Sequence, residues 1–395
     1  MRIPRPRSAK GWIASGLGAL AAVGLGFFLI APYNIAASVP HLPGVSWLLH
    51  QYMQNAVRTW SAGTERPDWL DLDDPALIRL GAGHFEGGCA PCHGAPGRAP
   101  NPIVEGMLPA PPPLEQPARE YGADELHWLV LNGLKYTAMP AWPGEHRDDE
   151  PWALAAFLLR YPELDAEGYE RLAYGPVEPA PEAPLASART ISFSGRADRL
   201  ESVEDNCARC HGEDGLGRDG TAPKLAGQSR EYLHATLLGY AAGDRPSGVM
   251  EPIAAALTPA EMESLAARFA AMPAFGPEPF DPADAALYAL GAELAGRGTD
   301  DVPSCLACHG DGLTPARKPL YPAIGGQTRR FLTVWLRLWR ERDWGATGFS
   351  HLMHAAARPL DDRQIEALAV FFAAGGAAAR TAAVQPGARP APAAD

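Results

Sequence analysis

The chain has 395 residues, a formal net charge of −12 and 47% hydrophobic residues. That length allows about two to four domains of ordinary size, each with its own core. The acidic balance argues against nucleic-acid binding and favours basic protein partners, since summed charge acts on association and not on fold.

The N-terminus predicts a membrane anchor. The first 64 residues contain no acidic residue, and a basic flank at 1–10 precedes an uncharged stretch from Gly11 to Ala31. About 20 helical residues cross a hydrocarbon core of roughly 30 Å, whereas a signal peptide usually has an apolar region of about 7–15 residues. We therefore expect residues 11–32 to be an uncleaved, single transmembrane helix in a bacterial inner membrane. By the positive-inside rule the N-terminus is cytoplasmic and the rest is periplasmic.

A membrane-proximal amphipathic helix is predicted within residues 41–65. Apolar residues between Val45 and Trp60 recur at helical spacing, and polar residues between His50 and Arg58 take the other face. The apolar stripe either packs on the domain that follows or docks on lipid or another membrane subunit. The sequence alone does not distinguish between these two interpretations.

Composition divides the rest of the chain into a first segment (66–170), a second segment (191–275) and a third segment (276–380). Pro- and Ala-rich stretches mark a linker at 171–190 and a disordered tail at 381–395. Strand signals are scarce. Helical patterns dominate, for example at 124–131, 230–240, 259–271, 328–340 and 361–374. The predicted fold class is all-α, with three small domains in tandem.

All six cysteines fall into three Cys-x-x-Cys-His runs, each followed by glycine. Such a run is the attachment signal for haem c. We therefore expect three covalent haems, with one histidine of each run bound to iron. The expected thioether cysteines and proximal histidines are Cys89, Cys92 and His93, then Cys207, Cys210 and His211, then Cys305, Cys308 and His309.

Cys-x-x-Cys pairs also occur in zinc sites, thioredoxin-like redox pairs and disulfides. A zinc site combines such pairs into sets of four. A redox pair does not require histidine directly after the second cysteine, yet that histidine occurs here three times. The pattern favours haem over all three alternatives.

A low-spin electron-transfer haem needs a second axial ligand, and methionine opposite histidine raises the reduction potential. Met139, Met250 and Met353 follow the three histidines at similar distances, each in a predicted loop before the last apolar helix of its segment. We predict these three methionines as the distal ligands.

The other candidate ligands are weaker. Most methionines fill gaps in cores; of the remaining ones, Met107 follows its histidine too closely, and Met262 and Met272 fall within or at the end of a helix. Either His351 or His354 could replace Met353, because imidazole also binds haem iron. Ordinary helix or loop positions are expected for His84, His127, His146 and His234.

The second and third segments repeat one design. Residues 223–228 (PKLAGQ) correspond to 322–327 (PAIGGQ), and the apolar run 265–269 corresponds to 368–372. The first segment shares the haem run, the methionine and an apolar run at 154–157, and is a more distant relative.

These motifs resemble the class I cytochrome c family, and the second and third segments are similar to the two halves of dihaem cytochrome c4. The resemblance implies three tandem class I cytochrome c domains after the transmembrane helix. It also implies that the carbonyls of Pro223 and Pro322 support the proximal histidines. In the first segment the supporting proline could be any within Pro109 to Pro113. That segment is similar to cytochromes of terminal oxidases and to domains of trihaem dehydrogenase subunits.

The leading functional prediction is an electron carrier and not an enzyme. It would relay single electrons from a quinol-oxidising complex or periplasmic donor to a terminal oxidase or soluble cytochrome, with no small-molecule substrate. The alternative is the cytochrome subunit of a periplasmic quinoprotein or flavoprotein dehydrogenase, of the alcohol or gluconate type. A haem enzyme or gas sensor would need an open coordination site on the iron. Three candidate methionine ligands for three haems argue against this alternative.

Overall fold

The computed structural model describes residues 8–178, 200, 202–218, 220, 222–310, 316–345 and 347–376. Within these residues every regular element is a helix, apart from an isolated bridge between Ala95 and Arg98. The all-α prediction is therefore confirmed. The expected tail and most of the expected linker lie outside the described residues.

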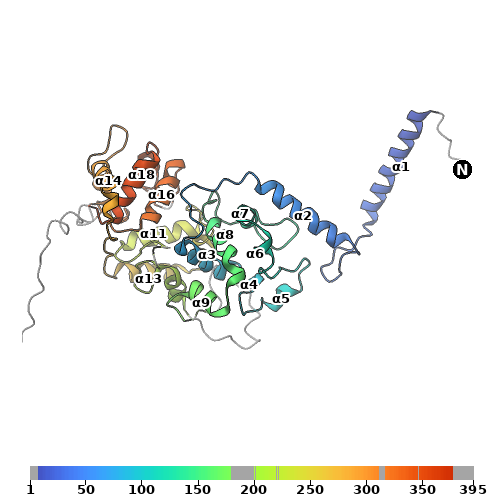
Figure 1. Cartoon of the computed structure of the whole chain (residues 1–395), viewed down its shortest axis with the longest axis horizontal. Coiled ribbons are helices and arrows are strands. Elements are labelled where there is room, and N and C mark those ends of the chain that lie inside the picture. Colours follow the sequence, from blue (N-terminus) through green and yellow to red (C-terminus); the bar gives the residue numbers. More distant parts are fainter. Residues whose placement is uncertain are drawn as a thin grey trace, which may run out of the picture.

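Helix α1 (Ala9–Ile30) stands apart from the rest of the chain (Figure 1). The Ser8 side chain caps its first turn, and it ends at Ala31 in the left-handed conformation. Among the described helices it alone is long and apolar enough to cross a membrane, a test of length and composition that a signal sequence also passes. The apolar helix predicted at 11–32 is present.

Helix α2 (Val45–Ser61) leads from α1 into the helical body (Figure 1). Its buried residues, Val57 and Ser61, lie in its C-terminal part, where Met53 also packs on the first core and accepts a hydrogen bond from the Tyr121 hydroxyl. At the other end Trp47 is 67% exposed. Packing on the following domain therefore accounts for the C-terminal part of the stripe alone.

The first segment forms one core around two crossing helices, α3 and α8. Its elements are α3 (Pro75–Gly88), α4 (Ala90–His93), α5 (Pro102–Glu105), α6 (Pro117–Glu120), α7 (Ala123–Asn132), α8 (Pro151–Arg160), η1 (Tyr161–Glu163) and α9 (Ala166–Tyr174). The buried Glu86 of α3 accepts hydrogen bonds from Tyr169 and Tyr174 of α9. Helix α9 thus belongs to this core, although its end falls in the range expected as linker.

The second and third segments each have a core of their own. The second contains α10 (Val203–His211), α11 (Arg230–Ala241), α12 (Met250–Ala255) and α13 (Pro259–Ala270). The third contains η2 (Pro282–Asp284), α14 (Ala285–Arg297), α15 (Leu306–His309), α16 (Arg329–Glu341), α17 (His351–Ala357) and α18 (Asp362–Ala373). The five helices named from the sequence are all present, with bounds close to those predicted.

The repeat between these two segments extends to their hydrogen bonds. Gly227 N donates to Phe269 O at 3.1 Å, and Gly326 N donates to Phe372 O at 2.6 Å. These pairs occupy equivalent positions in the two copies, so the repeated sequence builds the same local structure twice.

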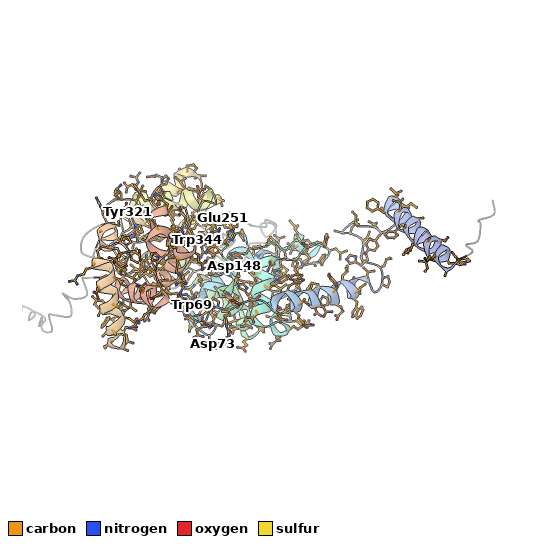
Figure 2. The ribbon with its side chains drawn as sticks, turned by 90° about the horizontal axis from the view of Figure 1, so that it is seen from above. Trp69, Asp73, Asp148, Glu251, Tyr321 and Trp344 are labelled. Carbon is orange, nitrogen blue, oxygen red and sulfur yellow. The ribbon has the colours of Figure 1, made fainter. Side chains whose placement is uncertain are left out.

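The third segment also packs against the first. Arg337 lies over the Trp69 ring at 5.0 Å, and Arg330 pairs with Asp74 at 2.7 Å. Figure 2 shows Trp69 and the neighbouring Asp73 beside the third segment. The three segments therefore contact one another in a single body and do not form an extended string.

Glycine permits the main helix crossing in the first and third segments. A Cβ on Gly81 would lie 1.9 Å from Ala153 O, and one on Gly291 would lie 2.1 Å from Ala367 O. Gly81 and Gly291 belong to α3 and α14, the first long helices of their cores, and the two carbonyls belong to α8 and α18. Side chains at these positions would force the helices apart.

We expect Gly291→Ala to lower the free energy of unfolding by about 1–3 kcal/mol, because the added methyl overlaps a backbone carbonyl. The matched control is Gly296→Ala in the same helix, where a Cβ meets nothing within 4 Å and should be neutral or stabilising by up to about 1 kcal/mol. Calorimetry of the detergent-solubilised full chain measures both. Equal shifts in melting temperature would contradict this account of the crossing.

Candidate functional site

Each Cys-x-x-Cys-His run ends a helix at its histidine. Helices α4, α10 and α15 close at His93, His211 and His309, and the glycine that follows has a φ of 72°, 79° or 71°. Glycine adopts this left-handed backbone without strain and turns the chain away from the helix. The same local sequence therefore presents the two cysteines and the histidine in the same way three times.

A proline carbonyl holds each of these histidines. Nδ1–H of His93 donates to Pro112 O, that of His211 to Pro223 O, and that of His309 to Pro322 O, each at 2.9 Å. Pro223 and Pro322 are the residues that the family resemblance implied, and Pro112 is the supporting residue among the four prolines between Pro109 and Pro113. With Nδ1 protonated, Nε2 carries the lone pair that can bind iron.

Burial favours the neutral thiol at the first cysteine of each run. All six are free, and burial raises the pKa of Cys89 and Cys207 to about 12 and that of Cys305 to about 11. A thioredoxin-like redox pair needs a thiolate, which a low pKa favours, so the raised pKa values argue against that alternative. No group of three or more His, Cys, Asp or Glu among the described residues could hold a metal ion. The donor set fits haem c.

The candidate methionines are half-buried, but their local structure differs from the prediction. Met139 lies in the α7–α8 loop as expected. Met250 is instead the first residue of α12, and Met353 lies within α17. Short helices form there because Ser247 Oγ accepts from Met250 N, and because the run 351–357 has no glycine or proline. The assignment of all three as distal ligands stays a prediction.

The other candidates have structural positions. Met262 lies within α13 and is buried, as is usual for a methionine that packs in the interior. His354 Nδ1 donates to Trp339 O at 2.8 Å, and His351 is exposed. His354 stays an alternative to Met353, since its ring is held as the proximal histidines are. His127 bonds Asp148 O and stacks on Trp152.

Comparison with known proteins agrees with this geometry. Residues 76–158 match the family described as Cytochrome C oxidase, cbb3-type, subunit III, and residues 201–284 match Cytochrome c. The chain is also 36% identical over 196 residues to the thiosulfate dehydrogenase electron acceptor of Stutzerimonas stutzeri, covering 49% of this chain and 88% of that relative. The chain belongs to the cytochrome c family. It also contains domains similar to those of cytochrome c4.

Two further relatives extend the comparison. The cytochrome is 32% identical to the thiosulfate dehydrogenase electron acceptor of Thiomonas intermedia, over 43% of this chain and 78% of the relative. It is 28% identical to cytochrome c4 of Stutzerimonas stutzeri, over 46% of this chain and 93% of the relative. Cytochrome c domains imply covalent haem c, and the three cysteine pairs are consistent with three haems.

The proline loops of the cytochrome also join its second and third segments. The buried Gln228 donates to Ala323 O at 2.7 Å and accepts from Ala323 N at 2.9 Å. In the same way Gln327 donates to Lys224 O at 2.6 Å and accepts from Lys224 N at 3.1 Å. Each glutamine thus binds the residue that follows the supporting proline of the other segment.

Arg209 joins the second haem run to the first segment. It is buried, and its guanidinium donates to Gly83 O at 2.6 Å and to Ala173 O at 3.5 Å. Next to it, burial lowers the pKa of His84 to about 3, with added repulsion from Arg209 and Arg147. His84 lies in helix α3 as expected, and its side chain is neutral beside the Arg209 contact.

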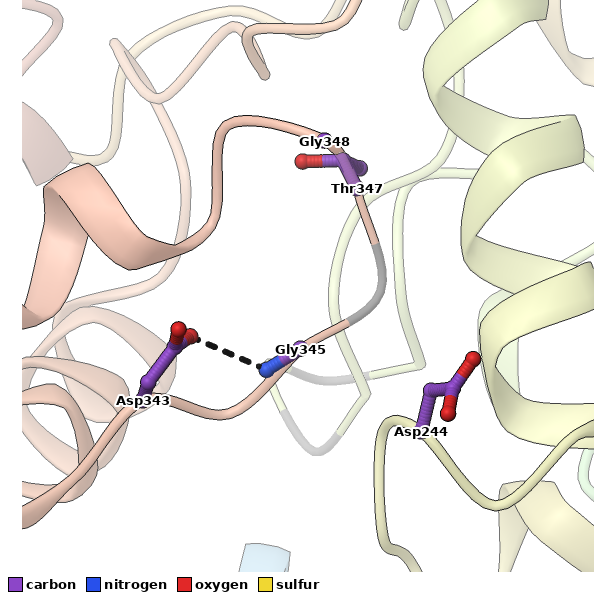
Figure 3. A pocket seen from close by; sticks show the side chains of 5 residues that line it. All are labelled: Asp244, Asp343, Gly345, Thr347 and Gly348. Atoms are coloured by element: carbon purple, nitrogen blue, oxygen red, sulfur yellow. Dashed lines mark hydrogen bonds between the residues drawn. The ribbon is translucent and has the colours of Figure 1, made fainter.

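An open cleft lies between the second and third segments (Figure 3). Asp244 faces it from one side, and Asp343, Gly345 and Thr347 line the other. The Asp343 carboxylate accepts from Gly345 N at 3.2 Å. A Cβ on Gly345 would lie 2.1 Å from Asp244 O, so the loops that precede Met250 and Met353 touch below the cleft.

Sequence reasoning missed the residues that join the segments. Arg209 carried a usable signal, because the other two runs have only Ala, Pro and Leu between their cysteines. Glu150 carried none: it ends a run of charged residues, Arg147-Asp148-Asp149-Glu150, that reads as solvated surface. Charge pattern alone does not distinguish a buried carboxylate from an exposed one.

We expect Gln327→Ala to destabilise the contact between the second and third segments by about 1–3 kcal/mol, because it leaves the N–H and C=O of Lys224 unpaired. Hydrogen exchange at residues 222–228 should accelerate, and the melting temperature should fall. The control is Gln116→Ala, an exposed glutamine bonded to Glu120. Unchanged exchange at 222–228 would show that Gln327 does not hold the two loops together.

Proposed function

We propose that this cytochrome carries three haems and relays single electrons on the periplasmic side of a bacterial inner membrane, anchored by α1. The observation that carries the proposal is the threefold pairing of a Cys-x-x-Cys-His histidine with a proline carbonyl. The length and apolar composition of α1 support anchoring. The chain as a whole would be an electron carrier and not an enzyme.

Each part of the chain has a role in this proposal. Bound haem supplies reversible one-electron chemistry at its iron. The two cysteines of each run fix the macrocycle covalently, and the proline carbonyl orients the imidazole and increases its basicity. Met139, Met250 and Met353 would supply the sixth ligands and raise the potentials. With every iron saturated, no small molecule would bind.

The relatives favour one kind of electron donor. Two of them are named thiosulfate dehydrogenase electron acceptor, which supports a periplasmic dehydrogenase as the partner that reduces this cytochrome. We propose a dehydrogenase of that class as the periplasmic donor, in place of the alcohol or gluconate type that was the alternative prediction from the sequence. The electrons would leave to a terminal oxidase or soluble cytochrome.

We expect the purified protein to show three low-spin haems with the weak near-infrared band of methionine-to-ferric-haem coordination, and to bind no carbon monoxide. Met139→Ala, Met250→Ala and Met353→Ala should each remove about one third of that band, since one ligand of three is lost. His354→Ala is the control for the third haem and should retain the band. A high-spin haem in the wild type would contradict the relay.

We expect a thiosulfate dehydrogenase with thiosulfate to reduce the oxidised cytochrome in stopped-flow absorbance measurements. If the partner surface is basic, the rate should fall as ionic strength rises, because the cytochrome carries a net charge of −12 and salt screens attraction between opposite charges. A basic and an acidic small cytochrome c serve as controls for the effect of charge alone. Failure of reduction would remove this class of donor and leave the haem assignment intact.

A further inference from the structure

Glu150 is a buried carboxylate with donors from two segments. Its side chain is 9% exposed. Oε2 accepts from Trp142 Nε1 at 2.9 Å and from Gly248 N at 2.7 Å, and Oε1 accepts from Ser247 Oγ at 2.6 Å. Arg147 Nη1 lies 3.0 Å from Oε1. Both oxygens are therefore satisfied by partners on either side of an interface, as a buried charge requires.

These donors belong to the two chain stretches that carry candidate methionines. Trp142 lies three residues after Met139 and is itself fixed by Trp142 N donating to Leu131 O at 2.9 Å. Ser247 and Gly248 lie three and two residues before Met250. One carboxylate thus spans the Met139 loop (residues 133–142) and the Met250 loop (residues 246–250).

Ser247 carries the contact one step further. Its hydroxyl donates to Glu150 and at the same time accepts from Met250 N at 3.1 Å and Val249 N at 3.3 Å. The start of α12, and with it the backbone of Met250, is therefore set by a hydroxyl whose direction Glu150 fixes. Such a chain of hydrogen bonds is cooperative in a buried environment.

The two loops are in direct contact. A Cβ on Gly248 would lie 2.1 Å from Cε2 of Trp142, and one on Gly144 would lie 2.4 Å from Gly248 N. There is no room for a side chain between the loops, so movement of one is transmitted to the other.

Arg147, which pairs with the Glu150 carboxylate, is itself held by further contacts. It pairs with Asp149 at 2.8 Å, donates to Pro246 O at 3.1 Å, and lies over the ring of Trp335 at 5.4 Å. Burial raises the pKa of the Glu150 carboxyl, and the Arg147 guanidinium together with the Ser247 and Trp142 donors opposes that shift. Among the described contacts, none joins Glu150 to the Met353 helix.

We propose that Glu150 is a positioning residue that couples the Met139 and Met250 loops, so that ligation of the first and second haems is adjusted together. This inference rests on the proposed function, because it assigns Met139 and Met250 as ligands. Loosening the carboxylate contacts would weaken both iron–sulfur bonds, and weaker methionine ligation lowers a haem potential.

The test compares Glu150→Ala, Glu150→Gln and Asp149→Asn with wild type in the full-length haem-loaded protein. Asp149 is the matched control, since its carboxylate binds the same guanidinium but has no described contact with the second segment. Hydrogen exchange is read at 133–142 and 246–256, and the haem potentials and near-infrared band are read by redox titration.

We expect Glu150→Ala to speed exchange in both loops by about tenfold or more, since bonds to a buried charged group exceed neutral ones in strength. Two of the three potentials should fall together, with loss of up to two thirds of the near-infrared band. Glu150→Gln keeps acceptor oxygen for Trp142 and Gly248 and should give smaller changes in the same two haems. Asp149→Asn should leave both loops protected.

Exchange or potential changes confined to one loop, in either Glu150 variant, would overturn the coupling even if the relay stands. If Glu150→Ala does not fold, Glu150→Gln decides by the same criterion. A wild type without methionine-ligated haem would overturn the proposed function, and the exchange data would still decide whether Glu150 links the loops.

Discussion

The hydrogen bond from a histidine Nδ1 to a proline carbonyl is the constraint that recurs through this chain. It fixes the distance between the end of a cysteine-bearing helix and a loop that follows it, at 2.9 Å in all three segments. In the second and third segments the residue after that proline is bound by a glutamine from the other segment. Histidine orientation and segment docking therefore depend on the same loops.

Buried polar groups make specific contacts between the segments. Arg209, Gln228, Gln327 and Glu150 are all largely buried there, and each has partners across the boundary. Apolar contacts alone would permit the segments to slide, whereas a buried donor or acceptor is costly unless it meets its own partner. These side chains thus select one arrangement of three small domains that could each pack in several ways.

The sequence was sufficient to predict features that depend on residues close together along the chain. The five named helices follow from apolar periodicity, and their caps, such as the Asp361–Gln364 pair at the start of α18, are local as well. The family resemblance supplied Pro223 and Pro322. The sequence was insufficient where the outcome depends on packing with residues further along the chain. It did not select Pro112 among the neighbouring prolines, and it did not distinguish Glu150 from the other residues of its charged run. It also did not predict that Met250 and Met353 lie in short helices.

The three methionine-bearing stretches meet in one part of the molecule. Gly345 is in backbone contact with Asp244, and the ring of Trp335 lies under the guanidinium groups of Arg245 and Arg147, at 4.1 and 5.4 Å. Each of these stretches therefore contacts a neighbouring segment. In an isolated domain the same surface would be exposed to water. Burial and hydrogen bonding tune the reduction potential of a haem. The reduction potentials would therefore depend on the contacts between segments, and a segment expressed alone would have a different haem potential.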